Sequence, residues 1–195
     1  TCITTDVQDA SSNAIASAAS ATWTASMPVV WSESFETDGS GGTRYTLSCG
    51  EGDDGAWDYW KRTDGDSGAD YSGKDGDYFF GASDLDSGDA LTLGGSCSTH
   101  DAPQSIDFNA VDVSSYTTTR QLKFLIAGKD SSVGWDADNY ILVEYKIDSG
   151  SWTECIRFET IHVSDNNQIM KVDTDGDGVG DGTALSSTFA EFSCS

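Results

Sequence analysis

Two neighbouring segments near the end of the chain alternate apolar and polar residues, and this pattern constrains the fold more than any other feature. Residues 140–147 (YILVEYKI) and residues 151–159 (SWTECIRFE) flank a short turn that contains Gly150. Alternation with a period of two is typical of a half-buried β-strand, and a short Gly-containing connection between two such runs predicts a hairpin. The side chains expected to face the core are Ile141, Val143, Tyr145, Ile147, Trp152, Ile156 and Phe158.

The composition extends this prediction to the whole chain of 195 residues. Of its 33 acidic residues 26 are Asp, and it contains 21 Gly. Asp competes with the helix backbone for hydrogen bonds, so an Asp- and Gly-rich chain favours strands joined by turns. The further strands that we expect cover residues 29–35, 44–48, 77–82, 105–108, 111–113, 121–127 and 189–192. Together these patterns predict an all-β, antiparallel, jelly-roll-like β-sandwich with long Asp- and Gly-rich loops.

The net charge of −23 narrows the possible partners. Nucleic acids and anionic membrane surfaces are bound through Lys and Arg, of which the chain has only 10. No apolar run approaches the ~18 residues of a membrane-spanning helix. We therefore expect neither nucleic-acid binding nor membrane insertion.

The five cysteines are widely spaced, at Cys2, Cys49, Cys97, Cys155 and Cys194. They form no CxxC pair of the kind that binds zinc, and wide spacing favours long-range disulfides in an oxidising compartment. We predict the pairs Cys49–Cys97 and Cys155–Cys194, with other pairings still open, and this leaves Cys2 for a bond to another chain. The chain begins at Thr1 rather than Met, as a processed secreted protein would, so an extracellular or cell-surface location is expected. Reduced, buried cysteines in a cytosolic protein are the alternative.

Residues 1–27 differ in texture from the rest of the chain. The stretch 9–21 (DASSNAIASAASA) is almost entirely Ala, Ser and Asn, and the β-capable residues of the segment are sparse: Ile3, Val7, Ile15 and Trp23. We assign residues 1–27 to an N-terminal arm or linker and residues 28–195 to the sandwich domain. The arm could add a strand to a neighbouring copy and so build a homo-oligomer or homopolymer, or it could fold back on its own domain.

The strongest chemical signal is the loop 173–182, DTDGDGVGDG. Positions 1, 3, 5, 6 and 9 of an EF-hand-type calcium loop are matched by Asp173, Asp175, Asp177, Gly178 and Asp181. Alternate carboxylates can surround Ca²⁺ where a Gly allows the sharp turn, and the carbonyl of Val179 would supply position 7. Position 12 is Ala184 rather than Glu, so a carboxylate elsewhere or water must complete the coordination. We predict bound Ca²⁺; a solvated acidic turn is the alternative.

Two weaker candidate sites lie in other loops. Asp130, Asp136 and Asp138 flank Trp135 and could hold a second metal ion, although such a group is more often a plain surface turn. A second set, Trp57, Tyr59 and Trp60, follows an Asp-rich loop and could stack on a glycan. The alternative for these aromatic residues is burial in the core of a loop-rich fold.

Five segments in order resemble a known kind of module. They are SFETDGSGGTRYTLS (34–48), DYWKRTDG (58–65), DGDYFFGASDLD (75–86), WDADNYILVEYKIDSG (135–150) and DTDGDGVGDGTALSSTFAEF (173–192). Together they resemble a jelly-roll or laminin-G-like β-sandwich module of large secreted or surface proteins of marine bacteria, and the last segment contains a DxDxDG loop similar to those of thrombospondin type 3 repeats and dockerins. The resemblance implies a non-catalytic module with bound calcium. The cysteines are not part of the pattern, and residues 1–27 lie outside it.

Three classes of function follow from these observations. Asp pairs are too frequent to indicate catalysis, and neither His100 nor His162 lies in a catalytic motif, so we expect no enzymatic activity. A carbohydrate-binding or adhesion module of a larger secreted protein would use calcium and exposed aromatic side chains. The hypothesis that we favour is an extracellular structural subunit, stabilised by calcium, that self-assembles through its N-terminal arm, for example into a filament.

Overall fold

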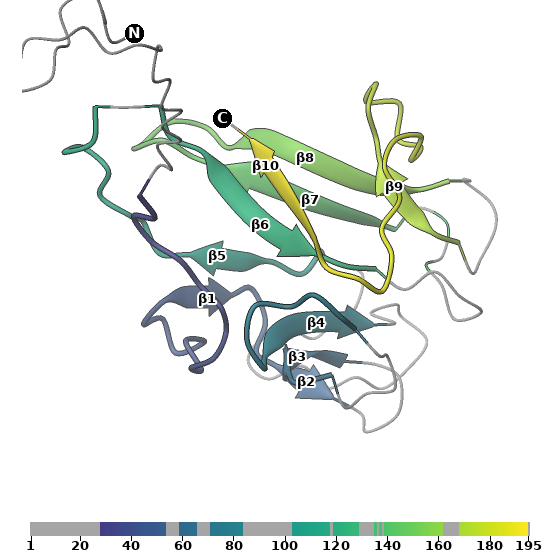
Figure 1. The fold of residues 1–195 in the computed structure, drawn as a ribbon, viewed down its shortest axis with the longest axis horizontal. Coiled ribbons are helices and arrows are strands. Elements are labelled where there is room, and N and C mark those ends of the chain that lie inside the picture. Colours follow the sequence, from purple (N-terminus) through teal and green to yellow (C-terminus); the bar gives the residue numbers. More distant parts are fainter. Residues whose placement is uncertain are drawn as a thin grey trace, which may run out of the picture. The chain divides into compact units, whose positions relative to one another are not determined.

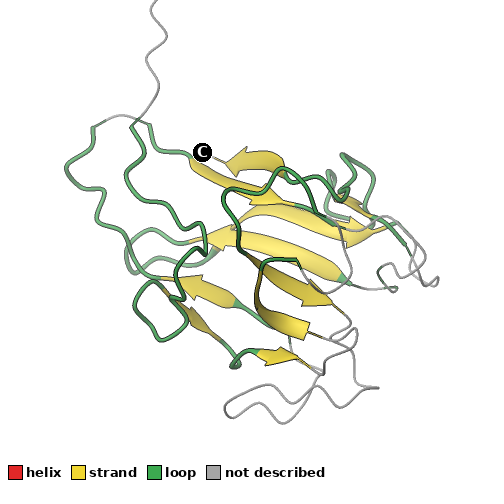
Figure 2. Ribbon diagram, turned by 60° about the horizontal axis from the view of Figure 1, so that its bottom comes forward, coloured by secondary structure: helices red, strands yellow, loops and turns green. Residues whose placement is uncertain are grey.

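The computed structural model describes residues 28–53, 59–65, 71–83, 103–117, 119–128, 135, 137, 139–161 and 168–194. The strands in this part are β1 (Tyr45–Leu47), β2 (Gly52–Asp53), β3 (Tyr59–Thr63), β4 (Phe79–Ser83), β5 (Ile106–Phe108), β6 (Leu122–Ile126), β7 (Tyr140–Tyr145), β8 (Thr153–Thr160), β9 (Met170–Val172) and β10 (Ala190–Cys194). The described residues form strands and loops only (Figure 2), and none of them belongs to a helix that could cross a membrane. Contacts divide the chain into two compact units, residues 1–31 and 32–195, and all ten described strands belong to the second.

These strands pair in four small sheets, ordered β1–β5, β10–β6, β2–β3–β4 and β7–β8–β9 (Figure 1). Every strand pairing in the described part is antiparallel. The prediction of an all-β, antiparallel, sandwich-like fold is therefore confirmed. The predicted N-terminal arm, residues 1–27, lies outside the described residues.

The larger core lies between the sheets β10–β6 and β7–β8–β9, with β6 and β10 crossing in front of β7 and β8 in Figure 1. Phe158, Met170 and Leu185 are buried at its centre. The side chains packed around them are Phe124, Ile126, Trp135, Ile141, Ile156, Val172 and Phe192. Burying one Phe or Met side chain contributes about 1.5–3 kcal/mol, so this cluster is the main apolar source of stability for the two sheets.

A smaller core lies between β1–β5 and the sheet β2–β3–β4. Cys49 and Trp60 are buried there, and the residues packed against them are Leu47, Phe80, Ala82 and Ile106. The Trp60 and Phe80 rings meet edge-on with centroids 4.7 Å apart. Tyr45, which is fully buried, adds a second aromatic contact to Phe80 at 6.3 Å.

A cluster of three aromatic rings joins β4 and the loop before it to the start of β10. The rings of Tyr71, Phe79 and Phe189 lie with centroids 5.3–5.9 Å apart, and burial raises the pKa of Tyr71 to about 12. The main chain of Ser72 also pairs in parallel with Thr188, just before β10 begins. The loop before β4 is thereby fixed to the start of the last strand.

The predicted hairpin is present as β7 and β8, but one of its side chains faces the other way. Ile156 and Phe158 pack in the core as expected, whereas Trp152 is 52% exposed. A bulge between Val143 and Glu144 leaves Cys155 as an extra residue on β8. Because one extra residue inverts the alternation, the side chains before it exchange faces, and the prediction for Trp152 is wrong for this reason. Ile147, also predicted to face inward, lies beyond the end of β7 and is 71% exposed.

Most of the other predicted strands are present with shifted ends, but two are absent and three were missed. Residues 29–35 and 111–113 form no strand. The strands that the sequence did not reveal are β2, β3 and β9. Phe35 has a φ of +60°, which is incompatible with an extended strand. This explains why the predicted strand 29–35 fails at its end.

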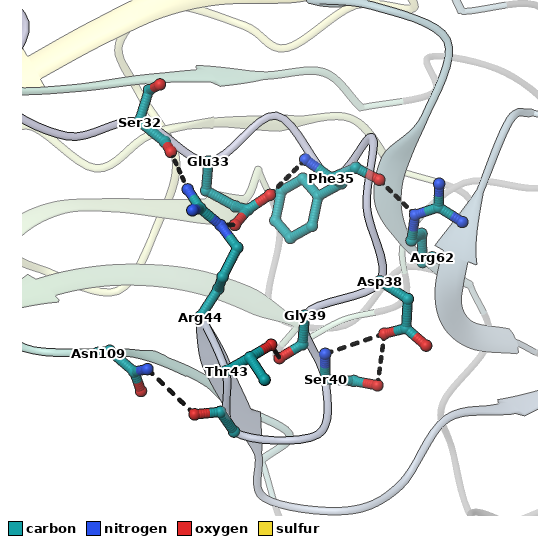
Figure 3. A network of polar contacts seen from close by, with 11 residues as sticks. Ser32, Glu33, Phe35, Asp38, Gly39, Ser40, Thr43, Arg44, Arg62 and Asn109 are labelled. Atoms are coloured by element: carbon teal, nitrogen blue, oxygen red, sulfur yellow. Dashed lines mark hydrogen bonds and ion pairs between the residues drawn. The ribbon is translucent and has the colours of Figure 1, made fainter.

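Side chains hold residues 32–38 in place of a β-ladder (Figure 3). The guanidinium of Arg44 bonds to the Glu33 carboxylate and to the carbonyl of Ser32, while Arg62 donates to the carbonyl of Phe35. The amide of Phe35 donates to Glu33 at 2.6 Å. These bonds satisfy main-chain groups that would otherwise need a neighbouring strand.

A disulfide between Cys155 and Cys194 joins β8 to β10, with Cα atoms 5.6 Å apart, as predicted. Cys49 is also disulfide-bonded. Its predicted partner Cys97 lies outside the described residues, so that pairing stays a prediction, as does a bond from Cys2 to another chain.

Candidate metal centre

The loop that follows β9 is anchored to the sheet at both ends. The amide of Asp173 donates to the carbonyl of Arg157 on β8 at 3.0 Å, and the amide of Gly182 donates to that of Val172 on β9 at 2.7 Å. Between these anchors the chain turns sharply at Gly176 and Gly178, whose φ angles are +76° and +85°. Only Gly adopts such angles without strain, which is why the DxDGDG sequence folds into this loop.

The turns bring three carboxylates together. Oxygen atoms of Asp173, Asp175 and Asp177 all lie within 4.8 Å of one another, with Asp173 half-buried and the other two exposed. This cluster has the residue types and the spacing to hold a metal ion. The sequence predicted these three residues from their alternation alone.

Main-chain amides hold the Asp173 carboxylate ionised. Gly176 and Gly178 donate to its two oxygens at 2.7 and 3.1 Å. Desolvation raises the pKa of Asp173, and the bonds from the main-chain amides lower it. The amide bonds together have the larger effect, so the pKa of Asp173 lies below its ordinary value. Asp177 is fixed in turn by a bond from the amide of Val179 at 2.9 Å. Two of the three carboxylates are therefore oriented without an ion.

Asp181, predicted at position 9 of the loop, lies outside the three-carboxylate group, and its role as a ligand stays a prediction. Its Oδ1 accepts hydrogen bonds from the Thr174 hydroxyl at 2.7 Å and from the Thr174 amide at 3.0 Å. These bonds lower the pKa of Asp181. In this arrangement Asp181 links the end of the loop to Thr174 near its beginning. The role of the Val179 carbonyl as a ligand stays a prediction.

Residues of the loop and of β8 together line an open pocket of about 400 Å³. Besides residues of the loop, its lining contains Glu154, Arg157 and Glu159. Arg157 donates to Glu159 at 3.0 Å and to Glu154 at 3.3 Å, and its guanidinium lies 4.8 Å from the centre of the Tyr140 ring. Sequence analysis did not identify these two carboxylates. The missing Glu at position 12 was the only indication that another acidic residue could lie near the loop.

The other predicted site residues divide into two groups. Asp130, Asp136 and Asp138 lie outside the described residues, as does Trp57. Tyr59 and Trp60 are only 6% and 7% exposed, so neither presents a ring face to a sugar. The glycan-stacking prediction is wrong for these two residues, because Trp60 packs against Cys49 and Phe80 in the smaller core and the Tyr59 ring lies against Gly81.

The fold and this site define the molecule as an all-β protein with a metal-compatible Asp loop anchored to one of its sheets. No protein-family model, curated protein or solved structure matches the chain.

Proposed function

We propose that this chain is a non-enzymatic structural subunit of an extracellular assembly, stabilised by Ca²⁺ in the loop 173–181 and self-associating through its N-terminal arm. The observation that carries the proposal is the cluster of Asp173, Asp175 and Asp177 on a loop anchored to β8 and β9. The resemblance to secreted β-sandwich modules with DxDxDG loops supports the same function.

The donor atoms favour calcium over other metals. All the clustered groups are carboxylates, and hard oxygen ligands suit Ca²⁺, whereas zinc sites usually contain Cys or His. Ca²⁺ also tolerates irregular coordination at about 2.3–2.6 Å, which suits an exposed loop whose remaining ligands are the Val179 carbonyl, a carboxylate from β8 or water. Mg²⁺ demands a nearly ideal octahedron and fits such a loop less well.

Two features of the site support a structural role over a catalytic one. The pKa values of Asp173 and Asp181 are lowered, whereas a general acid at neutral pH needs a raised pKa. The loop also connects β9 to the segment that leads into β10, so an ion bound there would fix the two sheets that share the larger core.

Calcium dependence of thermal stability tests the proposal. At a hundredfold excess of Ca²⁺ over its dissociation constant, binding stabilises the fold by about 2.7 kcal/mol. For a domain of this size we expect a Tm about 5–10 °C higher in Ca²⁺ than in EGTA. The measurement is differential scanning calorimetry at fixed ionic strength, with Mg²⁺ as the comparison ion.

Matched variants assign the effect to the loop. Asp175→Asn removes one clustered carboxylate and should abolish most of the calcium-dependent Tm shift. Asp107→Asn changes an exposed Asp on β5 by the same charge and should leave the shift intact. Equal Tm values in Ca²⁺ and EGTA for the unmodified chain would refute the calcium site.

A further inference from the structure

We propose that the edge of β10 that faces away from β6 is the acceptor for the arm, and that residues 3–7 of a second copy add to it as a strand. The inference rests on the proposed self-association and names the surface and the segment that would carry it out.

The contacts just before β10 show which of its main-chain groups face away from β6. The amide of Phe189 donates to the Ser72 carbonyl at 2.8 Å, and the Ser187 carbonyl accepts from the Ser72 amide at 3.0 Å. Residues 187 and 189 thus face the outer edge. Because the direction of these groups alternates along a strand, Glu191 and Ser193 face the same edge.

This outer edge continues beyond the point that Ser72 occupies. β6 is the only strand that pairs with β10 in the described part of the chain. Glu191 and Ser193 are exposed, and no second described strand pairs with Ala190–Cys194 on the side away from β6. The pairing at Ser72 shows that a third segment fits in line with β6 and β10. An accessible edge of this kind is a template for strand addition.

The arm contains one segment of matching length and pattern. Residues 3–7 read ITTDV, with Ile3, Thr5 and Val7 on one face and Thr4 and Asp6 on the other. Four of these five residues are β-branched, a composition that favours strands. Added beside β10, the face with Ile3 and Val7 would lie next to Phe192, which belongs to the larger core.

Reach and charge are compatible with a second copy as the donor. Residues 8–27 form a spacer of 20 residues, which spans up to roughly 65 Å when extended. A domain of this size has a diameter of about 40 Å, so the spacer is long enough to reach a neighbour. Residues 1–27 contain only Asp6 and Asp9 as charged groups, so they approach an acidic surface with little repulsion.

Hydrogen exchange of the full-length chain tests the acceptor edge directly. On assembly, exchange of the Glu191 and Ser193 amides should slow by about a hundredfold, because both gain ladder partners. The amide of Phe192, which faces β6, is the internal control and should be protected in monomer and assembly alike. Protection of Glu191 and Ser193 that is already complete in dilute monomer would show the arm docked on its own domain and would overturn the second copy.

Variants of the arm provide a test that does not disturb the sandwich. Ile3→Ser combined with Val7→Ser should weaken self-association by about a hundredfold in sedimentation velocity, since both apolar side chains lose their burial. Ile15→Ser, in the spacer, is the matched control and should associate like the unmodified chain. Normal assembly of the double variant overturns residues 3–7 as the donor, and assembly without protection of Glu191 and Ser193 overturns the β10 edge as the acceptor. A chain that stays monomeric with calcium at high concentration overturns the proposed self-association as well.

Discussion

At the scale of single residues, several Arg and Glu side chains bond to main-chain groups of the loops. Arg44, Arg62 and Arg120 all donate to backbone carbonyls. Glu36 accepts from the amides of Asp77 and Tyr78, both at 2.8 Å. Such bonds hold loop segments that lack a strand partner, and a charged acceptor or donor makes them stronger than neutral ones.

The position of Glu36 depends on a glycine, which gives a prediction at this scale. At Gly76 a Cβ atom would lie 2.3 Å from the Glu36 carboxylate, and the φ of +88° is strained for any other residue. Gly76→Ala should therefore lower the free energy of unfolding by about 2 kcal/mol, a typical cost for strain combined with a lost hydrogen-bond acceptor. Urea denaturation measures this change.

Gly41 provides the matched control. A Cβ atom at Gly41 meets nothing within 4 Å. Gly41→Ala should therefore change the free energy of unfolding by no more than about 0.5 kcal/mol. Equal stabilities of the two variants would contradict the role assigned to the close approach of Gly76 and Glu36.

At the scale of elements, β8 connects the features that matter most in this fold. It pairs with β7 and β9, contributes Phe158 to the core and is joined to β10 by its disulfide. Its exposed Glu154 and buried Glu159 line the pocket beside the Asp loop. The bulge at Cys155 is what allows one strand to direct its thiol and its acidic residues to opposite sides.

The disulfide gives a prediction at this scale. It closes a loop with a sequence separation of 39 residues, for which the chain-entropy model gives about 4 kcal/mol of stabilisation. Cys155→Ser combined with Cys194→Ser should lower the free energy of unfolding by an amount of this order. The measurement is guanidinium denaturation under non-reducing conditions, and Cys2→Ser is the control for loss of a thiol. A double variant as stable as the unmodified chain would show that core packing alone fixes β10.

At the scale of the whole molecule, the net charge of −23 opposes any association between copies. Raising the ionic strength from about 10 mM to about 150 mM shortens the Debye length from about 30 Å to about 8 Å. At constant Ca²⁺ we therefore expect self-association to strengthen by roughly three- to tenfold over this range, because screening reduces the repulsion. Analytical ultracentrifugation measures this, with a non-ionic solute at matched osmolality as the control. Association that weakens with salt would point instead to attraction between opposite charges.

Features that depend on neighbouring residues were predictable from the sequence. The alternation in residues 140–147 predicts β7, and the Asp and Gly content predicts an all-β chain, because strand periodicity and turn chemistry are local properties. The cluster of Asp173, Asp175 and Asp177 was also predictable from local sequence, since two glycines within the loop set its turns.

Tertiary structure decided the features that depend on segments far apart in the chain. The bulge opposite Val143 turned Trp152 outward, and packing against residues of other segments buried Tyr59 and Trp60. The same holds for the position of Glu154 and Glu159 under the loop, which alternation within β8 does not reveal. A sequence pattern fixes which residues share a face of one strand; which face is buried, and what lies against it, follows from the pairing and packing of distant strands.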